Sequence, residues 1–238
     1  MVFSSLEFIY LFLPPVLIGF LVLRHLKLES AIIWWLIAAS VGFYAWWSPI
    51  HVLLLIGSVL VNYGLHISLL RFRNKAVLIG GIVGNLALLG FFKYADFALQ
   101  NLKLVLGWES ASLGIVLPLA ISFFTFQQIS FLLDTWFGRI TACDFKRYVL
   151  FVTFFPQLIA GPIVLQKDTI PQFQLAVFRN RLWLNLMAGS TLFFIGLFKK
   201  IVLADGIAPA ANAVFAAADG GQSISTDAAW MGTPWIQV

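Results

Sequence analysis

Charge and cysteine are both scarce in this sequence. Only 11% of the 238 residues are charged, whereas soluble domains average about 25%. The single cysteine, Cys143, excludes an internal disulfide framework and a cysteine-rich metal site. The hydrophobic fraction is 61% and the mean hydropathy is +0.95. Because the apolar runs are continuous rather than alternating, they predict an all-α polytopic membrane protein instead of a β-barrel.

Catalytic and nucleotide-binding signatures are also missing. The sequence contains no Walker loop, dinucleotide fingerprint, HExxH or GxSxG. The three histidines, His25, His51 and His66, have no partner at a spacing typical of catalysis or metal binding, so a structural role is favoured for each. The net charge of +5 does not indicate nucleic-acid binding, because the basic residues lie between apolar runs.

The apolar runs predict a multi-span helical bundle, since a transmembrane helix needs about 20 mostly apolar residues. The first run has no basic segment before it and no cleavage motif after it, which favours a retained span over a signal peptide. The segment Lys93–Glu109 is typical of an amphipathic interfacial helix, and Gly206–Ala218 of a half-span or a second interfacial helix. The expected spans are Phe3–Leu23, Ala31–Trp47, Ile50–Leu70, Ala76–Phe92, Leu113–Leu133, Tyr148–Leu165 and Leu182–Leu203.

Without a linker between these runs, the sequence predicts a single transmembrane domain over residues 1–238, with a poorly ordered tail at 219–238. The positive-inside rule places the N-terminus outside, provided that Tyr148–Leu165 enters and leaves the membrane on one side. The basic residues then inside are Arg24, Lys27, Arg71, Arg73, Lys75, Arg139, Lys146, Arg147, Lys167, Arg179 and Arg181.

A re-entrant segment has local support around Pro156, Gly161 and Pro162, which interrupt one apolar run beside Gln157. Each proline removes an amide donor, and Gly161–Pro162 disfavours a continuing helix. A kinked but ordinary span is the alternative.

Polar residues recur inside two apolar runs. Gln127, Ser130 and Asp134 share one helical face at i, i+3 and i+7, and Thr125 and Gln128 share another. These faces fit either the lining of a polar cavity or hydrogen bonds between helices, and the residues alone leave the two even. Asp134 is also placed to pair with Arg139, which favours a structural role.

Lys199 and Lys200 interrupt the last long run, and Asp205 follows five residues after Lys200. Neighbouring residues on a helix point about 100° apart, so the two lysines cannot follow a single snorkelling face. Ion pairing within the protein is favoured over attraction of an anionic ligand.

The ordered set of motifs resembles the membrane-bound O-acyltransferase (MBOAT) family, in its alginate O-acetyltransferase-like branch. The resemblance is carried by MVFSSLEFIYLFLP, FYAWW, GFFKYADF, LPLAISFFTFQQISFLLDTWFG, FFPQLIAGPI and GLFKKIVLAD, in the family's order and spacing. It implies the N-terminal portion of an MBOAT fold, which is a helical bundle around a tunnel. The tunnel-lining or supporting candidates are Ser122, Gln127, Gln128, Ser130, Asp134, Pro156, Gln157, Gly161, Pro162, Lys199, Lys200 and Asp205.

The resemblance implies O-acetyl transfer to a cell-envelope polysaccharide such as alginate. The acyl donor, acetyl-CoA or an acylated carrier, would be a substrate rather than a bound cofactor. The family's catalytic histidine motifs are absent from these residues, so no catalytic residue is assigned and the chain alone is expected to be inactive. No metal or nucleic acid is expected.

The expected surroundings are the bacterial inner membrane, with extracytoplasmic acetylation proteins as partners and the polysaccharide as an indirect one. A non-enzymatic transporter or channel subunit, or an inactive remnant, is the alternative. Broken helices and buried charges are also typical of transporters, but no inverted repeat is apparent.

Overall fold

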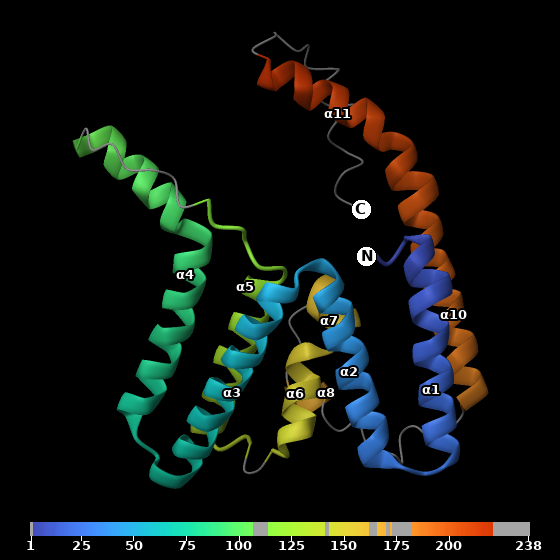
Figure 1. The fold of residues 1–238 in the computed structure, drawn as a ribbon, viewed down its shortest axis with the longest axis horizontal. Helices are drawn as coiled ribbons and strands as arrows, with labels where there is room; N and C mark the ends of the chain where they lie inside the picture. The colour runs from blue at the N-terminus through green and yellow to red at the C-terminus, as the bar shows by residue number, and fades with distance from the viewer. Residues whose placement is uncertain are drawn as a thin grey trace. The chain divides into compact units, whose positions relative to one another are not determined.

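The chain is helical in every regular element that the structure describes (Figure 1). The computed structural model describes residues 2–106, 114–140, 143–161, 166–169, 172 and 182–220. Within them, five helical segments are long and apolar enough to cross a membrane, which confirms an all-α multi-pass membrane protein. These segments are Glu7–His25, Glu29–Trp47, Pro49–Phe72, Lys75–Leu99 and Leu182–Pro209.

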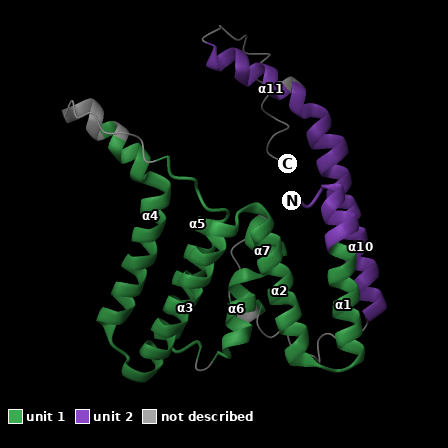
Figure 2. Ribbon diagram, in the orientation of Figure 1, with its two compact units in different colours: residues 1, 13–178 green, residues 2–12, 179–238 purple. Residues whose placement is uncertain are grey.

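The contacts divide the chain into two compact units (Figure 2). The first unit comprises residues 1 and 13–178, and the second comprises residues 2–12 and 179–238. Each is described below by itself. The single transmembrane domain expected from the sequence stays a prediction, and of the expected tail, residues 221–238 lie outside the described part.

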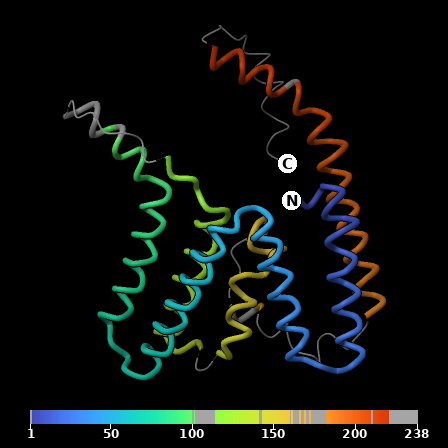
Figure 3. Tube along the Cα trace, viewed as in Figure 1, coloured from blue at the N-terminus to red at the C-terminus, as the bar shows by residue number. Residues whose placement is uncertain are grey.

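The first unit is built from long apolar helices joined by short turns. α3 begins with Pro49, whose missing amide costs nothing in the first turn of a helix. It ends at Arg73, which takes the left-handed conformation with φ 44° and turns the chain into α4. The four long helices here are α1 (Leu13–His25), α2 (Glu29–Trp47), α3 (Pro49–Phe72) and α4 (Lys75–Leu106). α3 and α4 form a hairpin (Figure 3).

α5 (Ile121–Trp136) packs against both α3 and α4 and carries much of the core. Gly81 of α4 permits this close approach, because a Cβ there would lie 2.9 Å from Leu132 Cδ1. Phe131 is buried on α5, and its ring lies 4.4 Å from that of Tyr148. Small residues let membrane helices pack closely where no hydrophobic force drives association.

The expected span Leu113–Leu133 is wrong at its start, because α5 begins only at Ile121. Residues 114–118 are non-helical, and Gly114 and Ala120 have φ values of 60° and 58°. Pro118 explains the late start, since proline disfavours helix for the residue before it. With 16 residues, α5 is about 24 Å long, shorter than the roughly 30 Å of a hydrocarbon core.

The expected separate interfacial helix at Lys93–Glu109 is also wrong as far as the structure describes it. α4 continues without a break from Lys75 to Leu106, and residues 107–109 lie outside the described part. No proline interrupts the sequence between Phe92 and Leu106, so nothing stops the helix at the apolar-to-polar transition.

The predicted break in the Tyr148–Leu165 run is confirmed. The segment forms two short helices, α6 (Phe145–Thr153) and α7 (Phe155–Ala160), separated at Phe154. Pro156 lies in the first turn of α7 and has no amide to continue the α6 ladder. Neither helix alone could cross a membrane.

The chain after α7 returns to the point where the broken segment began. Gln166, the first residue of α8 (Gln166–Thr169), donates from Nε2 to Cys143 Sγ at 3.3 Å. Cys143 precedes α6 by two residues. This contact favours the re-entrant alternative over a kinked ordinary span.

The second unit contains one nearly continuous helical run. α10 (Leu182–Phe198) passes into a π-helical stretch, Lys199–Ala204, and then into α11 (Asp205–Asp219). A boundary was expected between the span ending at Leu203 and the segment beginning at Gly206, but the helical run continues through it. Another π-helical turn, Glu7–Phe12, lies in this unit.

Candidate functional site

Five of the twelve candidate site residues lie on α5, and several of its polar side chains face the interior of the first unit. Thr125, Gln127, Gln128 and Asp134 are all at most 5% exposed. Ser122 and Ser130, also on α5, are only partly buried. With Thr135, α5 buries five polar residues. Each must be satisfied or used, because an unpaired polar group in an apolar setting costs free energy.

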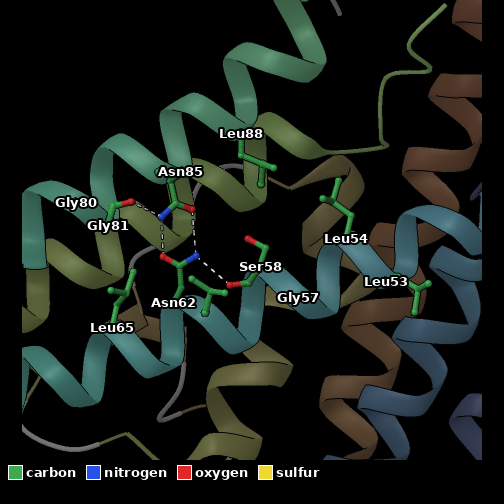
Figure 4. A pocket seen from close by; sticks show the side chains of 12 residues that line it. Leu53, Leu54, Gly57, Ser58, Asn62, Leu65, Gly80, Gly81, Asn85 and Leu88 are labelled. Carbon is green, nitrogen blue, oxygen red and sulfur yellow. Dashed lines mark hydrogen bonds between the residues drawn. The ribbon is translucent and has the colours of Figure 1, made fainter.

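Gln128 joins α5 to α3 and α4 through a ladder of side-chain amides. Its Oε1 accepts hydrogen bonds from Ser58 Oγ at 3.0 Å and from Asn62 Nδ2. Asn62 and Asn85 form a reciprocal amide pair, with N···O distances of 3.1 and 2.7 Å (Figure 4). Asn85 Nδ2 also donates to the Gly81 carbonyl at 2.8 Å. The ladder therefore connects three helices through side chains that are themselves buried.

Gln127 and Ser40 satisfy the backbone at the break between α6 and α7. In a continuous helix the Phe155 amide would donate to the Phe151 carbonyl. Instead, the Phe155 amide donates to Ser40 Oγ at 3.3 Å, and Gln127 Nε2 donates to the Phe151 carbonyl at 3.1 Å. Broken backbone at membrane depth needs such protein partners, so Gln127 stabilises the re-entrant segment.

His66 is buried against α5 and held in one tautomer. Thr135 Oγ1 donates to the Phe131 carbonyl at 2.9 Å, which uses its only hydrogen. The 2.8 Å contact between His66 Nδ1 and Thr135 Oγ1 therefore has the imidazole as donor. The ring of Phe131 also contacts that of His66, with 4.6 Å between the ring centres and a tilt of 42°. These contacts agree with the structural role favoured for this histidine.

Asp134 pairs with Arg139, as the structural alternative predicted. Arg139 Nη1 lies 2.9 Å from Asp134 Oδ1, and the carboxylate side chain is only 7% exposed. The Asp134 carbonyl also accepts from the amides of Arg139 and Ile140. These bonds close the C-terminal end of α5.

Gly161 ends α7 where no side chain would fit. A Cβ at this position would lie 2.7 Å from the Gln157 carbonyl oxygen, although the φ of −89° suits any residue. Pro156 lies in the first turn of α7, and Pro162 lies outside the described residues.

Lys200 and Asp205 form an ion pair in the second unit, as the favoured interpretation predicted. The five-residue spacing becomes a contact because Lys199–Ala204 is π-helical, where hydrogen bonds join residues i and i+5. The Asp205 amide donates to the Lys200 carbonyl in this way. Lys199 is exposed and makes no ion pair within the described residues.

Four buried atoms of uncharged polar side chains on α5, α6 and α7 have no hydrogen-bond partner among the described residues. They belong to Thr125 (Oγ1), Gln128 (Nε2), Tyr148 (Oη) and Gln157 (Oε1). A buried polar atom without a partner costs about 1–3 kcal/mol. These atoms offer two hydroxyls, an amide donor and an amide acceptor to water or to a polar ligand. Across the described residues, no three acidic, histidine or cysteine side chains come together as a metal site.

Sequence reasoning missed Ser40, Ser58, Asn62 and Asn85, which complete these contacts. The signal was present, because each is a polar residue inside an apolar run of the kind that marked Gln127 and Gln128. What no sequence pattern supplies is the pairing across helices that are 23 to 115 residues apart.

Comparison with known proteins gives several curated relatives over nearly the whole chain. A protein of Helicobacter pylori named "Peptidoglycan O-acetyltransferase" is 37% identical over 97% of the chain and 49% of its own length. Proteins named "Probable alginate O-acetylase AlgI" are 38% identical in Pseudomonas aeruginosa and 36% identical in Pseudomonas putida, each over 98% of the chain. Over nearly its whole length, the chain is similar to these O-acetylases. This confirms the resemblance drawn from the ordered motifs.

The chain spans about half the length of the curated relatives it matches, with 44% of the Pseudomonas aeruginosa protein and 48% of the Pseudomonas putida protein covered. No family model matches the chain, and no solved structure does. The similarity to O-acetylases thus rests on these relatives alone.

Proposed function

We propose that the chain forms part of the wall of a membrane O-acetyltransferase site that acetylates a cell-envelope polysaccharide such as alginate. The observation that supports this most is the buried polar face of α5 in a chain whose relatives are named as O-acetylases. The proposal makes this face, with the re-entrant segment beside it, a tunnel lining rather than a structural contact alone.

The reaction requires a polar path through an apolar bundle. A hydroxyl oxygen of the acceptor attacks the acetyl carbonyl of a thioester donor such as acetyl-CoA. The carbon–sulfur bond then breaks, and the thiol leaves with a proton. The hydroxyl proton needs a base, for which histidine is the usual side chain. We assign no base here, because the family's histidine motifs do not occur in these 238 residues.

The unpaired atoms of Thr125, Gln128, Tyr148 and Gln157 support this proposal. Polar groups kept without protein partners inside a membrane bundle usually have a functional use. In the proposed site they bind water or the polar part of a substrate. Gln127 holds the re-entrant segment and so positions Gln157.

The proposed location is the bacterial inner membrane with the N-terminus outside. Extracytoplasmic acetylation proteins would be the partners, and they would pass the acetyl group to the polysaccharide. The orientation is supported by the basic residues that follow α1 and α3.

Two measurements test the proposal. Membranes that contain only this chain are expected to transfer no acetyl group from acetyl-CoA to polymer; turnover above background would contradict that expectation. A chimera that replaces the matching half of the Helicobacter pylori relative with this chain is expected to restore O-acetylation of peptidoglycan in cells lacking that relative.

In this chimera, Gln127→Leu and Gln128→Leu should each lower acetylation by roughly 10- to 100-fold, the range expected when a site is misplaced by about 1 Å. The exposed Phe126→Leu serves as the control on the same helix. A functional chimera that tolerates both glutamine substitutions would exclude the α5 face from the site.

The alternative is a transporter or channel subunit, which the comparisons do not favour. Substrate uptake by the reconstituted chain without acylation would favour it instead.

A further inference from the structure

A cavity of about 550 Å³ lies between α3 and α4, on the side of the hairpin where Ser58, Asn62 and Asn85 lie. It runs along the hairpin from Leu53 on α3 to Leu65, with Gly80, Gly84 and Leu88 on the opposite helix (Figure 4). This volume falls within the range of about 300–1,000 Å³ of small-molecule sites.

The cavity is suited to an apolar ligand. Asn62 and Asn85 line it, but their amides pair with each other. The remaining lining consists mostly of leucine, valine and glycine. An added Cβ at Gly80 or Gly84 would meet nothing within 4 Å, so this wall of the cavity is open.

The cavity lies around the middle of α3 and is open to an acyl chain that starts at one end of the hairpin. The 13 residues from Leu53 to Leu65 correspond to about 18 Å of helix. An acyl chain that begins at the membrane surface beside Arg71 would pass Leu65 and enter the cavity from that side.

Three basic side chains gather at that surface. Arg71, Arg73 and Lys75 lie at the turn between α3 and α4, and all are exposed. None of them forms an ion pair in the part of the chain that the structure describes. Arg71 lies about 9 Å of helix beyond Leu65, which corresponds to the step from hydrocarbon to headgroup.

We propose that the α3–α4 hairpin binds one anionic phospholipid, with an acyl chain in the cavity and its phosphate at the Arg71–Lys75 turn. The apolar cavity selects a hydrocarbon chain, and the unpaired basic turn selects a negative headgroup. A packed helix would cover the same cavity but would leave the three charges without a partner. The inference does not depend on the acetyltransferase activity.

Lipid binding by the purified 238-residue chain tests this proposal. Native mass spectrometry would compare phosphatidylglycerol with phosphatidylcholine carrying the same acyl chains. The wild-type chain is expected to retain one phosphatidylglycerol, at least roughly tenfold more tightly than phosphatidylcholine, since each basic residue near a surface contributes measurably to anionic-lipid binding.

Two variants distinguish binding of the acyl chain from binding of the headgroup. Gly80→Leu with Gly84→Leu fills the cavity and should lower binding of both lipids at least tenfold. Neutralising Arg71, Arg73 and Lys75 to glutamine should instead abolish only the preference for phosphatidylglycerol. The control for the glycine variant is Gly64→Leu, at a glycine on α3 where an added Cβ also meets nothing within 4 Å. The control for the charge variant is Lys27→Gln with Lys93→Gln. Both controls should leave lipid binding unchanged.

Equal affinity for the two lipids in the wild-type chain would overturn the proposal. Undiminished phosphatidylglycerol binding by the Gly80→Leu/Gly84→Leu variant would do the same, provided that its thermal unfolding matches that of the Gly64→Leu control. A lipid-free dimer that this double variant disrupts would assign the cavity to helix packing between copies of the chain.

Discussion

Individual polar residues in this chain replace backbone partners that a broken helix loses. Ser40 accepts from the Phe155 amide, and Gln127 donates to the Phe151 carbonyl. Tyr44 does the same for the non-helical residues before α5, because its hydroxyl donates to the Leu119 carbonyl at 2.9 Å. Irregular backbone is thereby tolerated inside an apolar bundle.

Cys143 should react slowly with alkylating reagents at neutral pH. Burial and the neighbouring Asp144 carboxylate raise the pKa of its thiol from 9.0 to about 11. The thiolate is the reactive form. A shift of two pKa units lowers the thiolate fraction at pH 8 about 100-fold.

Because Cys143 is the only cysteine, N-ethylmaleimide labelling followed by intact-mass analysis measures it directly. The rate should rise about tenfold per pH unit until the pH approaches 11, and chain unfolded in guanidinium should react at the ordinary rate. Equal rates for folded and unfolded chain at pH 8 would contradict the burial of this thiol.

Replacing Gly161 with alanine should destabilise the turn after α7. The new Cβ would lie within 3 Å of the backbone of Gln157, which cannot move without distorting α7. Overpacking of this kind costs about 1–3 kcal/mol. Unfolding in sodium dodecyl sulfate gives the loss in free energy of unfolding.

Gly42→Ala on α2 is the matched control, because a Cβ there meets nothing within 4 Å. It should be neutral or should stabilise α2 by up to about 1 kcal/mol, as alanine favours helix over glycine. The prediction fails if the two substitutions have the same effect.

At the scale of elements, the amide ladder defines how α3, α4 and α5 pack. The Oδ1 atoms of Asn62 and Asn85 each accept from the other amide, so removal of one side chain leaves the Oδ1 of the other buried without that partner. The single substitutions Asn62→Leu and Asn85→Leu should each cost about 1–3 kcal/mol. The double substitution should cost less than their sum by about 0.6–2 kcal/mol, the usual strength of polar contacts between membrane helices.

A double-mutant cycle on the free energy of unfolding measures this coupling. Asn101 on α4 provides the control, because its exposed amide donates to the Phe97 carbonyl of its own helix. Asn62→Leu combined with Asn101→Leu should therefore be additive. Additivity of the Asn62 and Asn85 substitutions would refute the ladder.

At the scale of the whole molecule, the hydrogen bond between Gln166 and Cys143 makes residues 143–166 a loop that returns to its origin. Together with the basic residues at the turns, this predicts where each loop lies. Asn74, Asp144 and Thr169 should be on the inner side of the membrane, and Ser48 on the outer side.

Single cysteines at these four positions, in a chain with Cys143→Ala, test the arrangement. A thiol reagent that does not cross membranes should label Ser48→Cys in intact cells and the other three only after lysis. Opposite accessibility of Asp144→Cys and Thr169→Cys would show that the segment crosses the membrane as an ordinary kinked span.

The sequence alone determined the composition-driven features of this protein. Continuous apolar runs specified a helical membrane protein, and Pro156 with Gly161 specified a broken segment, because these properties are local. The pairing of Asp134 with Arg139 and of Lys200 with Asp205 was also predictable, since each pair lies within five residues.

Only the tertiary structure decided which polar residues meet. The helical periodicity of Gln127 and Gln128 fitted the lining of a cavity and hydrogen bonds between helices equally well. The structure shows that each makes an interhelical hydrogen bond. Gln128 Nε2 is still left without a partner among the described residues. The late start of α5 and the ladder through Asn62 and Asn85 were likewise visible only in the tertiary structure. Contacts between residues far apart in the chain depend on how helices pack, and a local pattern contains no information about that.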